Sequence, residues 1–282
     1  ESIEIDPDFP PSYNNMATIY SRLEQYDKAI KSSLKAIALN PNDPDYYFNL
    51  GNDYADIKQY DDAIRNYLKA IELNPDDADS YNALGATYLD LEQYDDAIRN
   101  CMKAIEINPV HGLAYRNLGV IYGIQEQYDS AIRNLKKAIE TNPDDAEYYV
   151  MVGAVYDGLG QINDAINNYQ KAIEINPDYF DAYYGLGVAY GGLGQINEAI
   201  NSYQKAIEIN PNYFDAYYNL GVTYLSLEQY DDAIRSYLKA IELSPDNYYS
   251  YNNLGIAYFR LNQHGDAIRS YLKAIEINPD IP

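Results

Sequence analysis

The sequence predicts an all-α fold in which one unit of two helices is repeated eight times. The main observation is a series of prolines at steps of 34 residues: Pro41, Pro75, Pro109, Pro143, Pro177, Pro211, Pro245 and Pro279, with Pro7 one step earlier. A fixed period of this size indicates one supersecondary unit copied in tandem, with each copy burying its apolar face on the next. The core of such an array runs along a line, so chain length alone does not set the number of domains.

Each period contains two helical patterns, which residues 44–77 illustrate. The first pattern has spacing i, i+3, i+4 and i+7, in Tyr47, Leu50, Gly51 and Tyr54. The second pattern forms a similar stripe in Ile64, Tyr67, Leu68 and Ile71. Asp61 and Asp62 begin the second helix, where the helix dipole favours acids. Pro75 follows its end, because proline disfavours helical geometry in the residue before it. We expect the two backbones to approach closely where Gly51 faces Ala63.

The remaining positions of the unit recur with the proline. The set Tyr47, Leu50, Gly51, Tyr54, Ala63, Tyr67, Ala70 and Pro75 returns as Tyr217, Leu220, Gly221, Tyr224, Ala233, Tyr237, Ala240 and Pro245. This pattern resembles the tetratricopeptide repeat. Two departures are visible: tyrosine stands where the family usually has tryptophan, and the second-helix aromatic is replaced by Ser33, Cys101 and Leu135. The replacements are apolar or small, so the fold prediction is unchanged.

The resemblance covers residues 8–279 and implies a right-handed α-α superhelix. It divides the chain into repeats 8–41, 42–75, 76–109, 110–143, 144–177, 178–211, 212–245 and 246–279. Residues 1–7 align with the end of a second helix, so we expect them to close a preceding repeat, and residues 280–282 are a short remnant. This pattern favours a slice of a longer array.

Composition and motifs exclude several classes of function. The formal net charge of −23 argues against nucleic acid and anionic membrane surfaces, which attract basic proteins. No apolar run approaches the length of a transmembrane span. His111 and His264 have no cysteine or histidine at metal-ligand spacing, and no residue is a credible nucleophile or general base. We therefore expect no catalysis, no cofactor and no metal.

The resemblance implies that the first helices line a concave groove, where partners of this family usually bind as extended peptides or helices. Asparagine recurs at one position of this groove, in Asn15, Asn49, Asn117, Asn219 and Asn253. The series is similar to the asparagine ladder of the O-linked N-acetylglucosamine transferase repeats. An amide has both donors and an acceptor, so it can hold a peptide backbone whatever the side chains. Asparagine is also common at this place in the family, which leaves a purely structural reading open.

Tyrosine is in excess, with 34 copies and no tryptophan. Core positions account for most of them, and eight are left over: Tyr46, Tyr148, Tyr179, Tyr184, Tyr213, Tyr218, Tyr248 and Tyr249. Those at repeat junctions, such as Tyr179 and Tyr213, either fasten one repeat to the next or bind a partner. Tyr184 and Tyr218 lie on the first-helix face turned away from the core, which favours binding. The candidate peptide-binding residues are Asn15, Asn49, Asn52, Asn117, Asp181, Tyr184, Asp215, Tyr218, Asn219, Asn253 and Phe259.

The groove positions are more acidic than basic. Asp45, Asp79, Glu147, Asp181 and Asp215 recur at one place and Asp56, Asp90 and Asp157 at another, against Arg22, Arg116 and Arg260. A protein or peptide partner should then be neutral or basic and should associate faster at low salt. The leading hypothesis is a non-enzymatic interaction scaffold for a peptide. The alternatives are a substrate-recruiting arm of a larger enzyme, and an array that self-associates end to end because Ile268, Leu272 and Ile275 have no following repeat.

The turn between the paired helices is rich in glycine in the fifth and sixth repeats, at Gly158, Gly160, Gly191, Gly192 and Gly194. Glycine inside a helix costs up to ~1 kcal/mol relative to alanine. The sequence therefore predicts lower local stability around residues 158–202.

Overall fold

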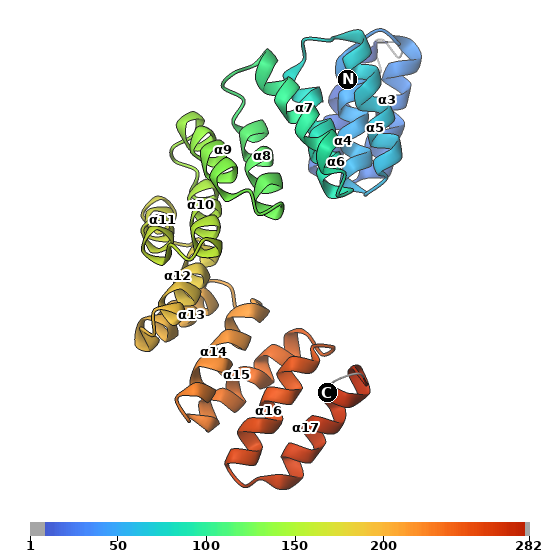
Figure 1. Cartoon of the computed structure of the whole chain (residues 1–282). Coiled ribbons are helices and arrows are strands. Elements are labelled where there is room, and N and C mark those ends of the chain that lie inside the picture. Colours follow the sequence, from blue (N-terminus) through green and yellow to red (C-terminus); the bar gives the residue numbers. More distant parts are fainter. Residues whose placement is uncertain (1–8, 280–282) are drawn as a thin grey trace. The chain divides into compact units, whose positions relative to one another are not determined.

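The structure is a computed structural model that describes residues 9–279, and the proposals for residues 1–7 and 280–282 lie outside this range (Figure 1). Within it there are sixteen helices and no strand. The first helices of the pairs are α2 (Pro10–Arg22), α4 (Pro44–Asp56), α6 (Ala78–Asp90), α8 (Gly112–Ile124), α10 (Ala146–Gly158), α12 (Phe180–Gly192), α14 (Phe214–Ser226) and α16 (Tyr248–Arg260). The second helices are α3 (Tyr26–Leu39), α5 (Tyr60–Leu73), α7 (Tyr94–Ile107), α9 (Tyr128–Thr141), α11 (Ile162–Ile175), α13 (Ile196–Ile209), α15 (Tyr230–Leu243) and α17 (His264–Ile277). The predicted all-α fold of paired helices is confirmed.

The chain divides into two compact units, the first ending at Pro143 and the second beginning at Asp144. In each unit a first helix packs most closely on its own second helix, and next on the second helix of the preceding repeat. Consecutive first helices are also in contact, α2 with α4 and α6 with α8 in the first unit, and α10 with α12 in the second. Each repeat thus contacts only its neighbours, as in other repeat arrays. No helix in the described part of the chain is long and apolar enough to cross a membrane.

First helices begin at side-chain caps in most repeats. The Asp43 carboxylate accepts a hydrogen bond from the backbone N–H of Asp45 (3.1 Å), and Pro44 occupies the first helical position, where its missing N–H costs nothing. Asp77, Asp145 and Asn247 cap the third, fifth and eighth repeats in the same way. These caps fix where the first helix starts, and with it the register of every residue on its exposed face.

The turn between paired helices requires a left-handed backbone. Its residue has φ between 55° and 61° in six repeats, at Glu24, Lys58, Glu92, Glu126, Glu228 and Asn262, and φ of 71° at Gly160 and Gly194. Such a φ disfavours residues with a Cβ, whereas glycine adopts it readily. Two of the five glycines expected to weaken this region therefore occupy the positions where glycine is the favoured residue. The expectation of low stability around 158–202 now depends on Gly158, Gly191 and Gly192 alone.

Close contact between the paired helices is confirmed at the repeated glycine. A Cβ built on Gly51 would lie 2.6 Å from Cε1 of Tyr67, and one on Gly221 would lie 2.7 Å from Cε1 of Tyr237. The equivalent second-helix position is buried in the first seven repeats whatever occupies it, because Ser33 and Cys101 are also fully buried, and only Tyr271 of the last repeat is half-buried. The absent aromatics are therefore tolerated core substitutions.

Candidate functional site

We define the inner stripe as the first-helix positions of Asp45, Phe48, Asn49, Asn52 and Asp56, together with their equivalents at 34-residue intervals. Nine of the eleven candidate residues lie on it at the positions of Asp45, Phe48 and Asn49: Asn15, Asn49, Asn117, Asp181, Tyr184, Asp215, Tyr218, Asn219 and Asn253. Asn52 also belongs to it, and Phe259 lies in the last turn of α16.

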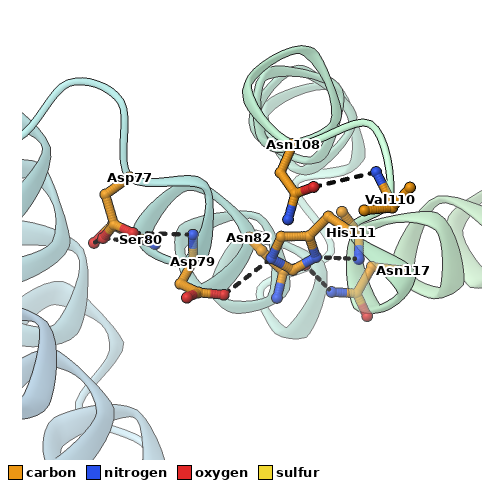
Figure 2. A network of polar contacts seen from close by, with 9 residues as sticks. Asp77, Asp79, Ser80, Asn82, Asn108, Val110, His111 and Asn117 are labelled. Carbon is orange, nitrogen blue, oxygen red and sulfur yellow. Dashed lines mark hydrogen bonds and ion pairs between the residues drawn. The ribbon is translucent and has the colours of Figure 1, made fainter. Parts of the chain in front are cut away.

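The asparagines in the first unit connect first helices of consecutive repeats. Nδ2 of Asn49 donates to Oδ1 of Asn14 (2.9 Å), and Nδ2 of Asn117 donates to Oδ1 of Asn82 (3.0 Å; Figure 2). Oδ1 of Asn117 also accepts from Nη1 of Arg116 (3.2 Å), and Asn117 is buried. One donor of each amide is therefore engaged inside the protein.

The same arrangement occurs in the second unit with tyrosine as the acceptor. Nδ2 of Asn219 donates to the hydroxyl of Tyr184 (2.9 Å), and Nδ2 of Asn253 donates to the hydroxyl of Tyr218 (3.3 Å). Burial raises the pKa of both tyrosine hydroxyls above the usual value, so both rings are neutral at physiological pH. The sequence placed these tyrosines and asparagines on one face, and the structure joins them in pairs.

The surplus tyrosines differ in their surroundings. Tyr46 and Tyr148 are buried, each 4% exposed, so they are packing residues. The Tyr213 ring lies 5.0 Å from the Phe180 ring and 5.1 Å from the Tyr184 ring, both edge to face, which fastens the seventh repeat to the sixth. The structural reading of the junction tyrosines is therefore supported at Tyr213.

Polar contacts around His111 join the third and fourth repeats, as Figure 2 shows. Nδ1 of His111 accepts from the backbone N–H of Ala114 (3.2 Å), and Nε2 lies 3.1 Å from Oδ1 of Asp79. Because Nδ1 is an acceptor, the ring proton is on Nε2, where it is donated to Asp79. His111 thus caps α8 and ties it to α6. In the described residues, no group of three histidine, cysteine or acidic side chains is placed to hold a metal ion.

A cavity of about 440 Å³ lies on the inner stripe of the second unit, between α10, α11 and α12. Its apolar lining includes Val150, Met151 and the half-buried Tyr184, and its acidic lining includes Asp157 and Asp181. Burial raises the pKa of both carboxyls, although each also has a hydrogen bond from a tyrosine hydroxyl that opposes the rise. This combination suits an apolar side chain flanked by a neutral or basic one.

Other candidate residues extend from this cavity without lining it. Asp215 acts on Tyr184 from the next repeat, since its charge helps to raise the pKa of that hydroxyl. Tyr218 and Asn253 form the corresponding pair one repeat further on. The Phe259 ring is half exposed and lies 5.6 Å from the His264 ring. In the first unit, Asn15 is exposed on α2.

A second cavity, of about 340 Å³, lies between α2 and α4 in the first unit. The candidates Asn49 and Asn52 line it together with Asp53 and Asp56. The sequence reasoning missed Asp53, which is the most buried acidic residue of the described chain and is 1% exposed. Comparing repeats position by position would have found it, because no other repeat has a charged residue at this place.

Family comparisons agree with the geometry. Profiles described as TPR repeat match residues 19–57, 51–92, 158–194 and 192–228. Profiles described as tetratricopeptide repeat match residues 1–31, 76–144, 214–247 and 248–281. The chain belongs to the tetratricopeptide repeat family, whose members are typically non-enzymatic scaffolds for protein interaction. No curated protein matches the sequence significantly.

Solved structures of the same architecture include three that are informative. A crystal structure of MamA protein is 32% identical, with a TM-score of 0.53 over 60% of this chain and 92% of that one. A crystal structure of YrrB, a TPR protein with an unusual peptide-binding site, is 29% identical, with a TM-score of 0.51 over 65% of this chain and 95% of that one. The hetero-tetramer Cut9-Hcn1 of the APC/C is 20% identical, with a TM-score of 0.68 over 91% of this chain and 50% of that one, and shows the fold alone.

Proposed function

We propose that this scaffold binds an extended peptide segment, neutral or basic in charge, along the inner stripe, with the α10–α12 cavity as its main contact in the second unit. The observation that carries the proposal is the lining of that cavity, where Tyr184 and Met151 meet the carboxylates of Asp157 and Asp181. Tyrosine and methionine supply large contact area and adapt to different side chains. The similarity to YrrB supports peptide binding as the mode.

The asparagines would then contribute acceptors more than donors. One N–H of the Asn219 amide is given to Tyr184, and one N–H of Asn253 to Tyr218, so their carbonyl oxygens are left to accept from a peptide N–H. The internal bond also fixes the orientation of each amide before a ligand arrives, which lowers the entropy lost on binding.

The net charge determines how a partner approaches. With 43 acidic and 20 basic residues, the chain repels acidic segments at long range. Asp181 on the cavity lining and Asp215 beside the cavity add local negative charge. Mutating charges that stay partly exposed to solvent changes mainly the association rate and its salt dependence.

The test is selection of random peptides displayed on phage with the intact chain, followed by fluorescence anisotropy of the recovered sequences. We expect Tyr184→Ala to weaken binding by at least ~2 kcal/mol, the usual mark of a hot spot, which is about 30-fold in Kd. Asp181→Asn should slow association at low salt, and the matched control Asp164→Asn, on the exposed face of α11, should not. Recovery of no peptide, or equal binding by all variants, would refute the proposal.

Circular dichroism must accompany these measurements, because Tyr184 also packs on Tyr203, with ring centroids 6.0 Å apart. Tyr184→Phe keeps that packing and removes only the hydroxyl. If Tyr184→Ala unfolds its repeats while Tyr184→Phe binds normally, the tyrosine is a packing residue and the binding contact must lie elsewhere on the stripe.

End-to-end self-association is a second candidate function, and one observation favours it. Ile268 on α17 is 58% exposed, whereas its equivalent Ile234 is 8% exposed because α16 of the next repeat covers α15. An exposed apolar face of this kind favours an interface. Sedimentation velocity over a concentration series should show association of the 282-residue chain that Ile268→Lys abolishes. A monomer at all concentrations would count against this function.

A further inference from the structure

Two adjacent residues of the second repeat depart from the pattern of the other seven. Asn52 stands at a position occupied elsewhere by Thr18, Ala86, Val120, Ala154, Val188, Val222 and Ile256. Asp53 stands at a position occupied elsewhere by Ile19, Thr87, Ile121, Val155, Ala189, Thr223 and Ala257. The residues of the other seven repeats are mostly small or apolar, which is what packing requires at the two positions. A charged group at the second of them is not required by the fold.

The Asp53 carboxylate is buried and only half satisfied. Its Oδ1 accepts a hydrogen bond from Oγ of Ser21, one repeat earlier, and its Oδ2 is buried without a hydrogen-bond partner. An unpaired buried polar atom is rare in folded proteins, and a buried carboxylate without a counter-charge is strongly unfavourable. A ligand that donates to Oδ2 would remove this unfavourable term on binding.

The cavity between α2 and α4 is where such a ligand would lie, since Asp53 lines it. Asp56 also lines it, and the charge of Asp56 adds to burial in raising the pKa of Asp53. Arg22 lines the same cavity and makes no ion pair with either carboxylate in the described part of the chain. The cavity thus has two carboxylates and one guanidinium, so its net charge is negative.

Several hydrogen-bond acceptors line the cavity, together with the guanidinium of Arg22. The Asn49 amide donates to Asn14, which leaves its carbonyl oxygen as an acceptor, and Oδ1 of Asn52 accepts from the hydroxyl of Tyr67 (2.8 Å). The Asn49 oxygen and the Asp56 carboxylate are thus acceptors on the cavity lining, and Oδ2 of Asp53 is a third acceptor, which is buried and has no partner. A primary ammonium group carries three rotatable donors and a compact positive charge.

We propose that the α2–α4 cavity is a binding site for a primary ammonium group, the side chain of a lysine in a bound segment. The fit of the ammonium group depends only on the cavity, and its assignment to a peptide lysine rests on the proposed function. A guanidinium fits less well, because its planar fork needs two free carboxylate oxygens side by side, and Oδ1 of Asp53 already accepts from Ser21. Ca²⁺ is less suited because it takes six to eight oxygen ligands.

The first experiment tests the cavity without any peptide. The intact chain, labelled with ¹⁵N, is titrated at constant ionic strength with 1-butylammonium chloride while the side-chain amide signals of Asn49 and Asn52 are followed by NMR. We expect saturable shifts that are at least about tenfold weaker in affinity with 1-butanol or butylguanidinium. Equal responses to butanol and butylammonium would overturn the proposal, because they would show apolar binding only.

Variants make the test specific to Asp53. Asp53→Asn keeps the shape and removes the charge, and Asp53→Thr installs the residue that the third and seventh repeats already have at this position. Both should lower the affinity for butylammonium at least about tenfold, while Asp90→Asn, the equivalent of Asp56 in the next repeat, should leave it unchanged. Undiminished butylammonium binding by both Asp53 variants would refute the site. Two substitutions are used so that the test still stands if one variant does not fold.

A second experiment separates this inference from the proposed function. Peptides recovered on the intact chain are synthesised with lysine, norleucine or acetyl-lysine at the same position. The affinity of each is measured for the wild-type protein and for Asp53→Thr. A lysine preference that disappears in Asp53→Thr supports both ideas together. Butylammonium binding without any peptide binding would refute the proposed function and leave the ammonium site standing. Peptide binding that ignores lysine would remove the assignment to a peptide side chain.

Discussion

Replacing Asp53 by asparagine should stabilise this protein at neutral pH, although it removes a hydrogen-bonding carboxylate. The side chain is 1% exposed, and its Oδ2 has no partner to offset the loss of hydration. Asparagine has nearly the same shape, and its Oδ1 can still accept from Ser21. The substitution therefore removes a buried charge while the packing stays the same.

The pKa of the carboxyl gives the magnitude. Burial, reinforced by the charge of Asp56 and opposed by the hydrogen bond from Ser21, raises the pKa of Asp53 from 3.8 to about 6. A rise of about two units corresponds to ~3 kcal/mol of differential interaction, as an upper figure. Because the pKa of Asp53 is higher in the folded than in the unfolded chain, the carboxyl is protonated only in the folded state when the pH lies between the two pKa values. Stability is therefore full below the unfolded pKa and is lost as the pH rises through about 6.

The assay is urea unfolding followed by circular dichroism, with wild type and Asp53→Asn compared across this range. The chain has 43 acidic residues, so the stability of each protein changes with pH for many reasons. The difference between the two proteins isolates Asp53. It should be small below about pH 4 and should grow by ~3 kcal/mol or less up to about pH 7. Hydrogen exchange should locate the gain in α2–α5, because repeats contact only their neighbours.

A constant difference across the pH range would refute the reasoning, because it would show that Asp53 titrates alike in the folded and unfolded chains. Destabilisation by Asp53→Asn at neutral pH would be a stronger contradiction. It would mean that the carboxylate has a compensating partner, such as Arg22 in a different rotamer. Asp90→Asn, on an exposed carboxylate, is the control and should shift stability little.

Three further outcomes can be checked by the same methods. Gly191→Ala should stabilise the chain by up to ~1 kcal/mol, since a Cβ there meets nothing within 4 Å. Gly194→Ala should instead destabilise it by ~1 kcal/mol or more, because φ is 71° at this position. Equal effects of the two substitutions in urea unfolding would contradict this prediction. Cys101 is fully buried, and burial raises the pKa of its thiol to about 12. It should therefore react with a thiol reagent at least about 100-fold more slowly in the native than in the unfolded chain, and prompt native labelling would refute its burial. Tyr184→Phe and Asn219→Ala should each lower the free energy of unfolding by ~1 kcal/mol, and the double variant should lose little more than either single variant. Additive losses would show that the 2.9 Å hydrogen bond does not couple the two residues.

The fold was predictable because eight copies average out local ambiguity. A proline or a pair of tyrosines in one segment is weak information, but recurrence at 34 residues predicts the helix pairing and the core face together. The turn glycines show the limit of this reading. Sequence rules for helix interiors predict that Gly194 weakens the structure, and only the backbone angle of 71° shows that it occupies a left-handed position.

The surroundings of the candidate residues were not predictable from the sequence. Periodicity placed Tyr184 and Asn219 on the helix face turned away from the core, whereas both are half-buried and the Tyr184 ring packs on the core residue Tyr203. It could not show that these two residues, 35 positions apart on neighbouring helices, form a hydrogen bond. That contact depends on the angle at which α12 and α14 cross. Some hydrogen-bonding groups of these side chains, which the sequence assigned to a bound peptide, therefore bond to the neighbouring repeat instead.

Asp53 escaped the sequence reading for a related reason. A repeat is recognised by what its copies share, so a residue that differs in one copy counts as noise in the pattern. Physically the difference is the informative part, since packing is satisfied by alanine, valine, isoleucine or threonine at that position, and a carboxylate held there at 1% exposure opposes stability. A gain in stability from Asp53→Asn together with loss of ammonium binding would link the two effects, because the same uncompensated charge would account for both.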